Sequence, residues 1–189
     1  RELSSREPFA MFVGFHAPHE PYAMPEEYLN FCRPEQIELS ANSTQLEDRP
    51  AKSDSYQRRV EFFENRLGHP ISDDDIRKGI AGHHCLLKMV DDCLGRIMET
   101  LEATGLSRNT LVRYTSDHGD VRGGHRIFNK AATFYDSEVR IPMLMRFPDG
   151  RHAGRRIEEF GSSIDFAPTV FDILGMDVDC CIPGNSLCP

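Results

Sequence analysis

Two adjacent residues of the sequence, Asp117 and His118, carry side chains that can bind a metal ion. They stand directly before Gly119 and after the segment 110–116, which is predicted to be a strand. A carboxylate and an imidazole leaving a strand into a glycine turn can point into one concave site and supply two metal ligands. The same pair also fits an ordinary turn, in which Asp117 caps the backbone and His118 is exposed.

A second candidate is His19, which lies in a loop that carries a proline on each side of it, at Pro18 and Pro21. Each proline ring fixes one backbone angle, so the direction of the imidazole is restricted. An imidazole with a fixed direction is a candidate general acid. A surface loop in which His16 and His19 pair by coincidence, or a chance transition-metal site, is the alternative.

Two further polar residues follow the Asp117–His118 pair. Lys130 offers a point charge suited to an anionic oxygen, although most lysines are simply solvated. His125 follows a pair of glycines and could contact a substrate, but a role in the turn is favoured.

The apolar pattern predicts the elements that must position these residues. Strands are expected over 9–15, 110–116 and 141–147. Apolar residues spaced three and four apart predict a helix from Ser72, its N-cap, to Gly105, a left-handed stop.

A second helix is expected over 164–174, with Asp165 as its N-cap. The polar stretch 33–59 is expected to be a long loop, of the kind that often forms a lid or a specificity element. Strand, helix, strand, strand and helix in this order predict an α/β fold built on a layered sheet. Asp117 and His118 would then lie at the carboxyl end of a strand, where chemistry is usual in α/β folds.

Composition restricts the partners. The chain has 189 residues, 22 Lys and Arg against 30 Asp and Glu, and a formal net charge of −8. This acidic balance argues against a nucleic-acid or anionic-membrane partner and favours a small molecule. The longest apolar run, 9–15, is too short to span a membrane.

Three common enzyme classes are not indicated by the sequence. It contains no G-x-S-x-G, P-loop or G-x-G-x-x-G motif, which are the signatures of serine hydrolases, nucleotide triphosphatases and Rossmann oxidoreductases.

Six cysteines form no C-x-x-C pair, and Cys85 and Cys93 fall on the same predicted helix. Free buried thiols are therefore expected rather than disulfides.

Taken together and in order, these segments resemble the sulfatase family of the alkaline phosphatase superfamily. The nearest branch is that of choline sulfatases, iduronate sulfatase and phosphonate monoester hydrolases. The segments that carry the resemblance are 12–21, 90–97, 115–120, Lys130, 135–142 and 163–169. The resemblance implies an alkaline phosphatase-like layered sheet flanked by helices, present here as a partial domain.

The resemblance also implies a role for each candidate residue. Asp117 and His118 would be metal ligands, with calcium expected first and magnesium, manganese or zinc as alternatives. His19 would hydrogen-bond the sulfate and protonate the leaving oxygen, and Lys130, 13 positions after Asp117, would bind the sulfuryl group. His125 is kept as a further substrate-binding candidate.

The nucleophile of the resembled family is a formylglycine made from a C/S-x-P-x-R motif, which these 189 residues do not contain. Cys181 is followed by Ile182 and Pro183, but no arginine stands at the required position. We therefore expect residues 1–189 to be part of a sulfatase catalytic domain, without its N-terminal nucleophile-bearing section and its C-terminal subdomain. This chain alone would then be inactive.

The expected function of the whole enzyme is hydrolysis of a small-molecule or sugar sulfate ester. A phosphodiester or phosphonate monoester hydrolase of the same superfamily and a truncated, non-catalytic homologue are the alternatives.

Overall fold

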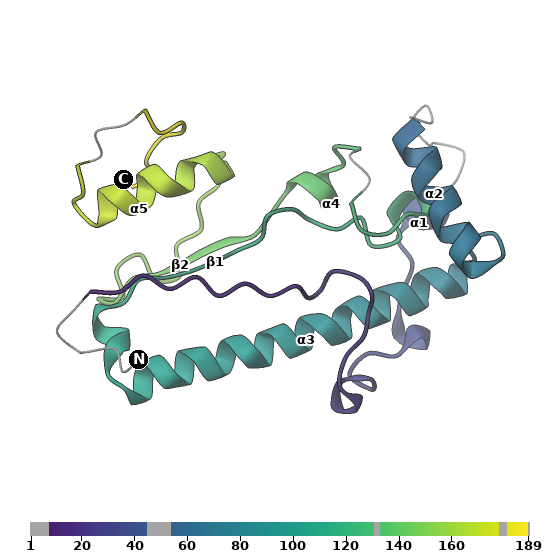
Figure 1. Cartoon of the computed structure of the whole chain (residues 1–189), viewed down its shortest axis with the longest axis horizontal. Helices are drawn as coiled ribbons and strands as arrows, with labels where there is room; N and C mark the ends of the chain where they lie inside the picture. Colours follow the sequence, from purple (N-terminus) through teal and green to yellow (C-terminus); the bar gives the residue numbers. More distant parts are fainter. Residues whose placement is uncertain (1–7, 45–53, 131–132, 178–180, 189) are drawn as a thin grey trace. The chain divides into compact units, whose positions relative to one another are not determined.

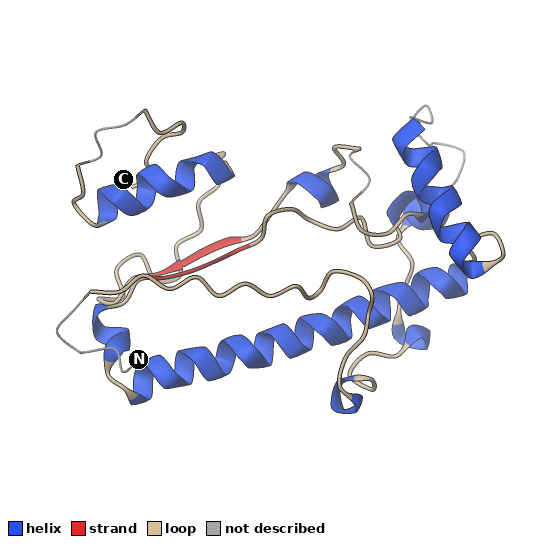
Figure 2. Ribbon diagram, viewed as in Figure 1, coloured by secondary structure: helices blue, strands red, loops and turns tan. Residues whose placement is uncertain are grey.

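The structure is a computed structural model that describes residues 8–44, 54–130, 133–177 and 181–188. The chain divides into two compact units, Arg1–Asp149 and Gly150–Pro189 (Figure 1). Helices and loops make up most of both units, with one pair of short strands in the first (Figure 2). No helix among the described residues is long and apolar enough to cross a membrane.

The longest element is α3, Asp73–Ala103, which confirms the helix predicted from Ser72. Ser72 Oγ accepts from the Asp75 N–H at 3.2 Å, and the Ser72 N–H donates to Asp75 Oδ2 at 2.9 Å. Burial works to raise the pKa of Asp75, but the hydrogen bonds from Ser72 lower it on balance. At the other end Gly105 takes the left-handed conformation, φ +72°, that stops the helix.

The segment 33–59 contains more helix than expected. The short helix α1 covers Ala41–Thr44, and α2, Asp54–Leu67, begins inside the predicted loop; residues 45–53 lie outside the described part. Three residues spaced four and three apart, Tyr56, Val60 and Phe63, give α2 an apolar face. The prediction of a loop was wrong here because the apolar face is narrow and the rest of the helix surface is charged.

The core of the first unit gathers around this face of α2. Tyr56 is buried with Val121 and Ile127. A second cluster contains Ile71, Ile76 and Phe128, against which Val60 and Phe63 pack. The start of α3 and the segment 121–128 are therefore fixed against α2.

Two of the three predicted strands are confirmed, each in a shorter form. β1, Val112–Thr115, pairs with β2, Met143–Arg146, in an antiparallel ladder that sets Val112 opposite Arg146. The connection between the two strands contains Asp117 and His118, the predicted metal ligands, and Lys130.

The strand predicted over 9–15 is absent. This segment is extended, but the structure assigns it to no ladder, and Phe12 is 95% exposed. An extended run becomes a strand only when a neighbour supplies hydrogen bonds, and the strands of the described residues, β1 and β2, pair with each other. Within the described residues the expected layered sheet is therefore a small two-stranded one.

Short helices complete the first unit. They are η1 (Glu26–Tyr28), η2 (Pro34–Gln36), η3 (Leu106–Asn109), η4 (Gly124–Arg126) and α4 (Asp136–Val139).

The second unit holds η5, Ser163–Asp165, and α5, Phe166–Ile173, close to the predicted bounds. Asp165 precedes α5 as expected, but its side chain does not cap that helix. Its carboxylate instead accepts from the Ser162 N–H at 2.7 Å and the Asn185 N–H at 2.9 Å. The Asn185 and Ser162 bonds lower the pKa of Asp165. Asp165 therefore ties the start of the helix to a distant loop.

The described cysteines are free, but the expectation that they are buried holds only for one of them; Cys85 and Cys93 both lie on α3. Cys85 is the buried one among them; Cys181 is exposed, and Cys180 lies outside the described residues.

Candidate functional site

The turn that follows β1 is fixed by Gly119. Its N–H donates to the carbonyl of Glu138 at 2.7 Å, and a Cβ at this position would lie 2.1 Å from the carbonyl oxygen of Ser137. Only glycine allows so close an approach. The two residues before it, Asp117 and His118, are thereby held at the end of the strand.

Asp117 caps the turn and still offers a free carboxylate edge. Its Oδ1 accepts from the His118 N–H at 3.0 Å, while its side chain is 88% exposed. Partial burial works to raise the pKa of Asp117, but backbone hydrogen bonds and the charge of Lys130 lower it on balance. Capping and metal binding are therefore compatible roles for this residue.

The imidazole of His118 is oriented by the backbone carbonyl of the next residue. Nδ1 lies 2.8 Å from the carbonyl oxygen of Gly119, an acceptor, so the proton is assigned to Nδ1. The lone pair of Nε2 is then available, 3.8 Å from Asp117 Oδ2. A carbonyl that holds one ring nitrogen in this way is the usual support of a histidine metal ligand.

Lys130 reaches the same nitrogen. Its Nζ lies 2.7 Å from His118 Nε2, so the ammonium donates to the lone pair that a metal would use. The structure thus brings Lys130, His118 and Asp117 together across the connection between β1 and β2.

His19 is held at both ring nitrogens. Nδ1 lies 2.7 Å from the carbonyl oxygen of Glu20, and Nε2 lies 3.2 Å from Asn129 Nδ2. Its ring also lies 4.9 Å, between centroids, from that of His16. Because Asn129 directly precedes Lys130, His19 and the Lys130–His118–Asp117 group form one continuous set.

Sequence reasoning missed two residues that connect this set. Asn129 is 3% exposed and touches both His19 and the Lys130 backbone. Arg59 of α2 lies 3.5 Å from the Glu20 carboxylate, and its Nε donates to the carbonyl of Phe128 at 3.3 Å. The apolar period of α2 could have revealed the helix, but nothing in the sequence pairs Arg59 with either loop.

The backbone around this set is strained. Four non-glycine residues between 122 and 129 have positive φ, namely Arg122 (46°), His125 (51°), Arg126 (61°) and Asn129 (60°). Such conformations are rare and cluster at functional sites.

His125 makes contacts of a different kind. Its ring stacks on Tyr135 with centroids 4.1 Å apart and planes 14° apart, and its carbonyl accepts from the Tyr56 hydroxyl at 2.8 Å. These contacts fit the turn role that the sequence favoured.

Beneath the His19 loop lies His83 of α3, which is 5% exposed and meets Tyr22 edge-on at 6.3 Å between ring centroids. Its Nδ1 has no hydrogen-bond partner within the described part of the chain. Burial lowers the pKa of His83 to about 4, helped by Arg122 and His84 and opposed by Asp120. His83 is therefore a neutral packing residue.

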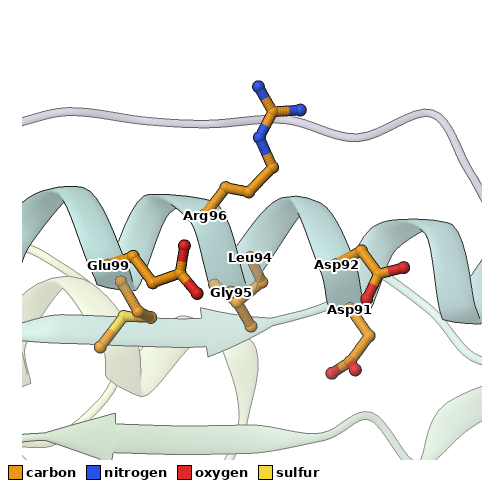
Figure 3. Close-up of a pocket in the computed structure, with 7 residues that line it drawn as sticks. Asp91, Asp92, Leu94, Gly95, Arg96 and Glu99 are labelled. Carbon is orange, nitrogen blue, oxygen red and sulfur yellow. The ribbon is translucent and has the colours of Figure 1, made fainter.

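In the described part of the chain, no third potential ligand lies with Asp117 and His118. Among the described residues, no group of three or more His, Cys, Asp or Glu side chains could hold an ion. A cavity of about 600 Å³ runs along α3, lined by Asp91, Asp92, Arg96 and Glu99 among others, and includes none of the site residues (Figure 3). Of the expected metal ligands, the described residues thus bring together only Asp117 and His118.

Comparison with known proteins shows what the chain as a whole is similar to. The sulfatase family model matches residues 2–176. The chain is 31% identical over 185 residues to "Uncharacterized sulfatase YidJ" of Escherichia coli (strain K12), covering 96% of this chain and 34% of that protein. It is also 31% identical over 192 residues to "Multifunctional alkaline phosphatase superfamily protein PehA" of Trinickia caryophylli, covering 96% and 37%.

Among solved structures, the phosphonate monoester hydrolase of Agrobacterium radiobacter is similar, with a TM-score of 0.71 and 28% identity. The match covers 90% of this chain and 36% of that one. This similarity confirms the expected α/β, alkaline phosphatase-like fold class. The chain spans about a third of the length of the relatives it matches. With the family model covering nearly all of its residues, the chain belongs to the sulfatase family.

Proposed function

We propose that the protein containing this chain hydrolyses the sulfate ester of a small molecule or sugar. Family membership supports sulfate ester hydrolysis in general. The observation that carries the proposal is the contact of Lys130 Nζ with His118 Nε2 at 2.7 Å, with His19 bound to Asn129, the residue before Lys130. The nucleophile, expected to be a formylglycine, would come from a section outside these 189 residues.

A divalent metal, with calcium the first candidate, would be held by Asp117 and His118. Their chemistry fits, because the carboxylate of Asp117 is exposed and the Nδ1–H tautomer of His118 places a lone pair on Nε2. Lys130 Nζ, which donates to that lone pair in this structure, would have to move aside for an ion to bind there. When bound, such an ion polarises the sulfate oxygens and favours attack at sulfur. Magnesium, manganese and zinc use the same donors and are alternatives.

The remaining residues act on the ester itself. The ammonium of Lys130 offsets negative charge on the non-bridging oxygens as the sulfur–oxygen bond to the leaving group breaks. His19 donates a proton from Nε2 to that leaving oxygen, so the alcohol departs neutral. His125, stacked on Tyr135, is a third candidate contact for the substrate.

A second candidate is hydrolysis of a phosphonate monoester or phosphodiester. It is favoured by the similarity to the phosphonate monoester hydrolase structure. The same residues suit it, because phosphoryl and sulfuryl groups both present anionic oxygens to a cation and a leaving oxygen to an acid.

The test compares 4-nitrophenyl sulfate with 4-nitrophenyl phenylphosphonate as substrates of the complete protein. We expect the higher kcat/KM with the sulfate; a reversed preference would favour the second candidate. Turnover of neither would support a non-catalytic homologue.

The metal assignment is tested by Asp117→Ala, measured as bound metal by mass spectrometry and as turnover. Both should be lost. The matched control is Asp136→Ala, which removes a comparably exposed carboxylate on α4 and should leave both unchanged. Unchanged metal content in Asp117→Ala would refute the assignment.

A further inference from the structure

Cys85 of α3 lies against the segment that joins η1 to η2. Its side chain is buried, and its thiol faces two main-chain carbonyls of that segment, those of Leu29 at 3.9 Å and Cys32 at 3.7 Å. A thiol is a weak donor, so these long contacts report a close approach more than a strong bond. The approach brings together two cysteines that are 53 positions apart in the sequence.

The thiols of Cys32 and Cys85 also influence each other. Burial raises the pKa of Cys32, and the charge of a Cys85 thiolate beside it raises this pKa further. A charge has this effect only on a group that lies near it. Because one sulfur already rests against the main chain of the other cysteine, rotation about the two Cα–Cβ bonds can bring the sulfurs together. Both η1 and η2 contact α3, so the backbones are held close to each other.

The third cysteine of the first unit is not suited to bond Cys85. Cys93 lies on the same helix, eight positions later, which corresponds to about 12 Å along the helix axis. A disulfide joins residues whose Cα atoms are about 4.4–6.8 Å apart, so Cys85 and Cys93 cannot be bridged. Within the first unit, Cys32 is therefore the candidate partner of Cys85.

We propose that Cys32 and Cys85 are a redox-active pair that forms a disulfide when the folded protein meets a disulfide oxidant such as oxidised glutathione. Cys32 is only partly buried, so its thiolate attacks the oxidant first. This step forms a mixed disulfide and releases one glutathione thiolate. The Cys85 thiolate then attacks the Cys32 sulfur, the bond between the two cysteines forms, and the second glutathione thiolate leaves.

The balance of this exchange is complete. Two protein thiols are oxidised and give up two protons, and one glutathione disulfide is reduced to two thiolates that take up two protons. The new bond joins the segment that follows the His19 loop to the longest helix of the first unit. No step involves an ester or a metal ion, so the proposal stands apart from the proposed function.

The test incubates the complete protein with oxidised glutathione in native buffer at about pH 8.5, where more of each thiol is ionised. Remaining thiols are blocked with iodoacetamide, and tryptic peptides are analysed by mass spectrometry without reduction. Lys88 separates Cys85 from Cys93, so a bond to either residue gives a different pair of peptides. We expect the Cys32 peptide to be joined to the Cys85 peptide in most molecules, and dithiothreitol to separate them.

Two variants check the order of the steps. Cys85→Ser removes the second thiol and should leave glutathione bound to Cys32. Cys93→Ser is the matched control, because it removes the other cysteine of α3 and should keep the Cys32–Cys85 bond in full. If Cys85→Ser does not fold, Cys32→Ser at the more accessible position replaces it and should leave the Cys85 thiol free.

A comparison with concentrated urea shows whether the fold directs the pairing. We expect the joined peptides to be about 10-fold more abundant in native buffer than in urea, because the unfolded chain no longer holds the two thiols together. Equal yields in the two conditions overturn the proposal. A wild type in which Cys32 carries only glutathione, bonds to Cys93 or stays free with Cys85 overturns it as well.

Discussion

Lys130 Nζ lies 2.7 Å from His118 Nε2, so a cation occupies the direction in which the imidazole lone pair points. The Nδ1–H bond to the Gly119 carbonyl leaves Nε2 as the acceptor. The residue expected to bind the anionic part of the substrate and a residue expected to bind metal therefore meet at one atom.

Replacing Lys130 with methionine should lower kcat/KM for 4-nitrophenyl sulfate by about 100- to 1,000-fold, the usual cost of removing one group that stabilises transition-state charge. Stability should change little, because the lysine is exposed. Lys78→Met, which removes an exposed lysine paired with Asp74 on α3, is the control and should retain full activity. Equal activity of the two variants would exclude a direct role for Lys130.

Gly119→Ala should destabilise the first unit by about 3 kcal/mol, because the added Cβ would lie 2.1 Å from the Ser137 carbonyl oxygen. The matched control is Gly95→Ala, whose Cβ meets nothing within 4 Å on an exposed part of α3. That change should stabilise the protein by about 1 kcal/mol through helix propensity. Urea unfolding of both variants measures the difference, and a stable Gly119→Ala would contradict the tight turn.

Stability should fall as the pH drops from about 6.5 to 4, in part through His83. Burial lowers its pKa to about 4, so the unfolded chain binds a proton in this window that the folded chain does not. The contribution of His83 to the free energy of unfolding is fully present above pH 6.5 and is lost as the pH falls towards 4. This contribution is about 3 kcal/mol at most.

The groups around His83 set this shift. Arg122 and His84 lower its pKa further, Asp120 raises it, and Tyr22 packs against its ring. His83→Gln should flatten the dependence of the unfolding free energy on pH between 4 and 7, measured in urea. His152→Gln, at an exposed position, should keep the wild-type slope.

The elements that the sequence predicts well are those whose signals are local. Ser72 caps α3 through Asp75, three residues away, and Gly105 ends it. The helix is visible in the sequence because its hydrogen bonds and its apolar face all lie within the segment itself.

Strand prediction depended on partners that a local pattern does not show. The run 9–15 has the composition of a strand, but it forms no ladder in the described residues. The predictions of β1 and β2 were confirmed because each of these strands supplies hydrogen bonds to the other.

By itself the sequence determined the α/β class, the long helix, and the residue types of the candidate site: Asp117, His118, Lys130 and His19. Only the tertiary structure decided how those residues are held. His19 and Asn129 are in contact although they are 110 positions apart in the sequence. Arg59 and Phe128 are in contact although they are 69 positions apart. Contacts at such separation arise from packing of α2 and α3 against the 121–128 segment, which no local periodicity encodes.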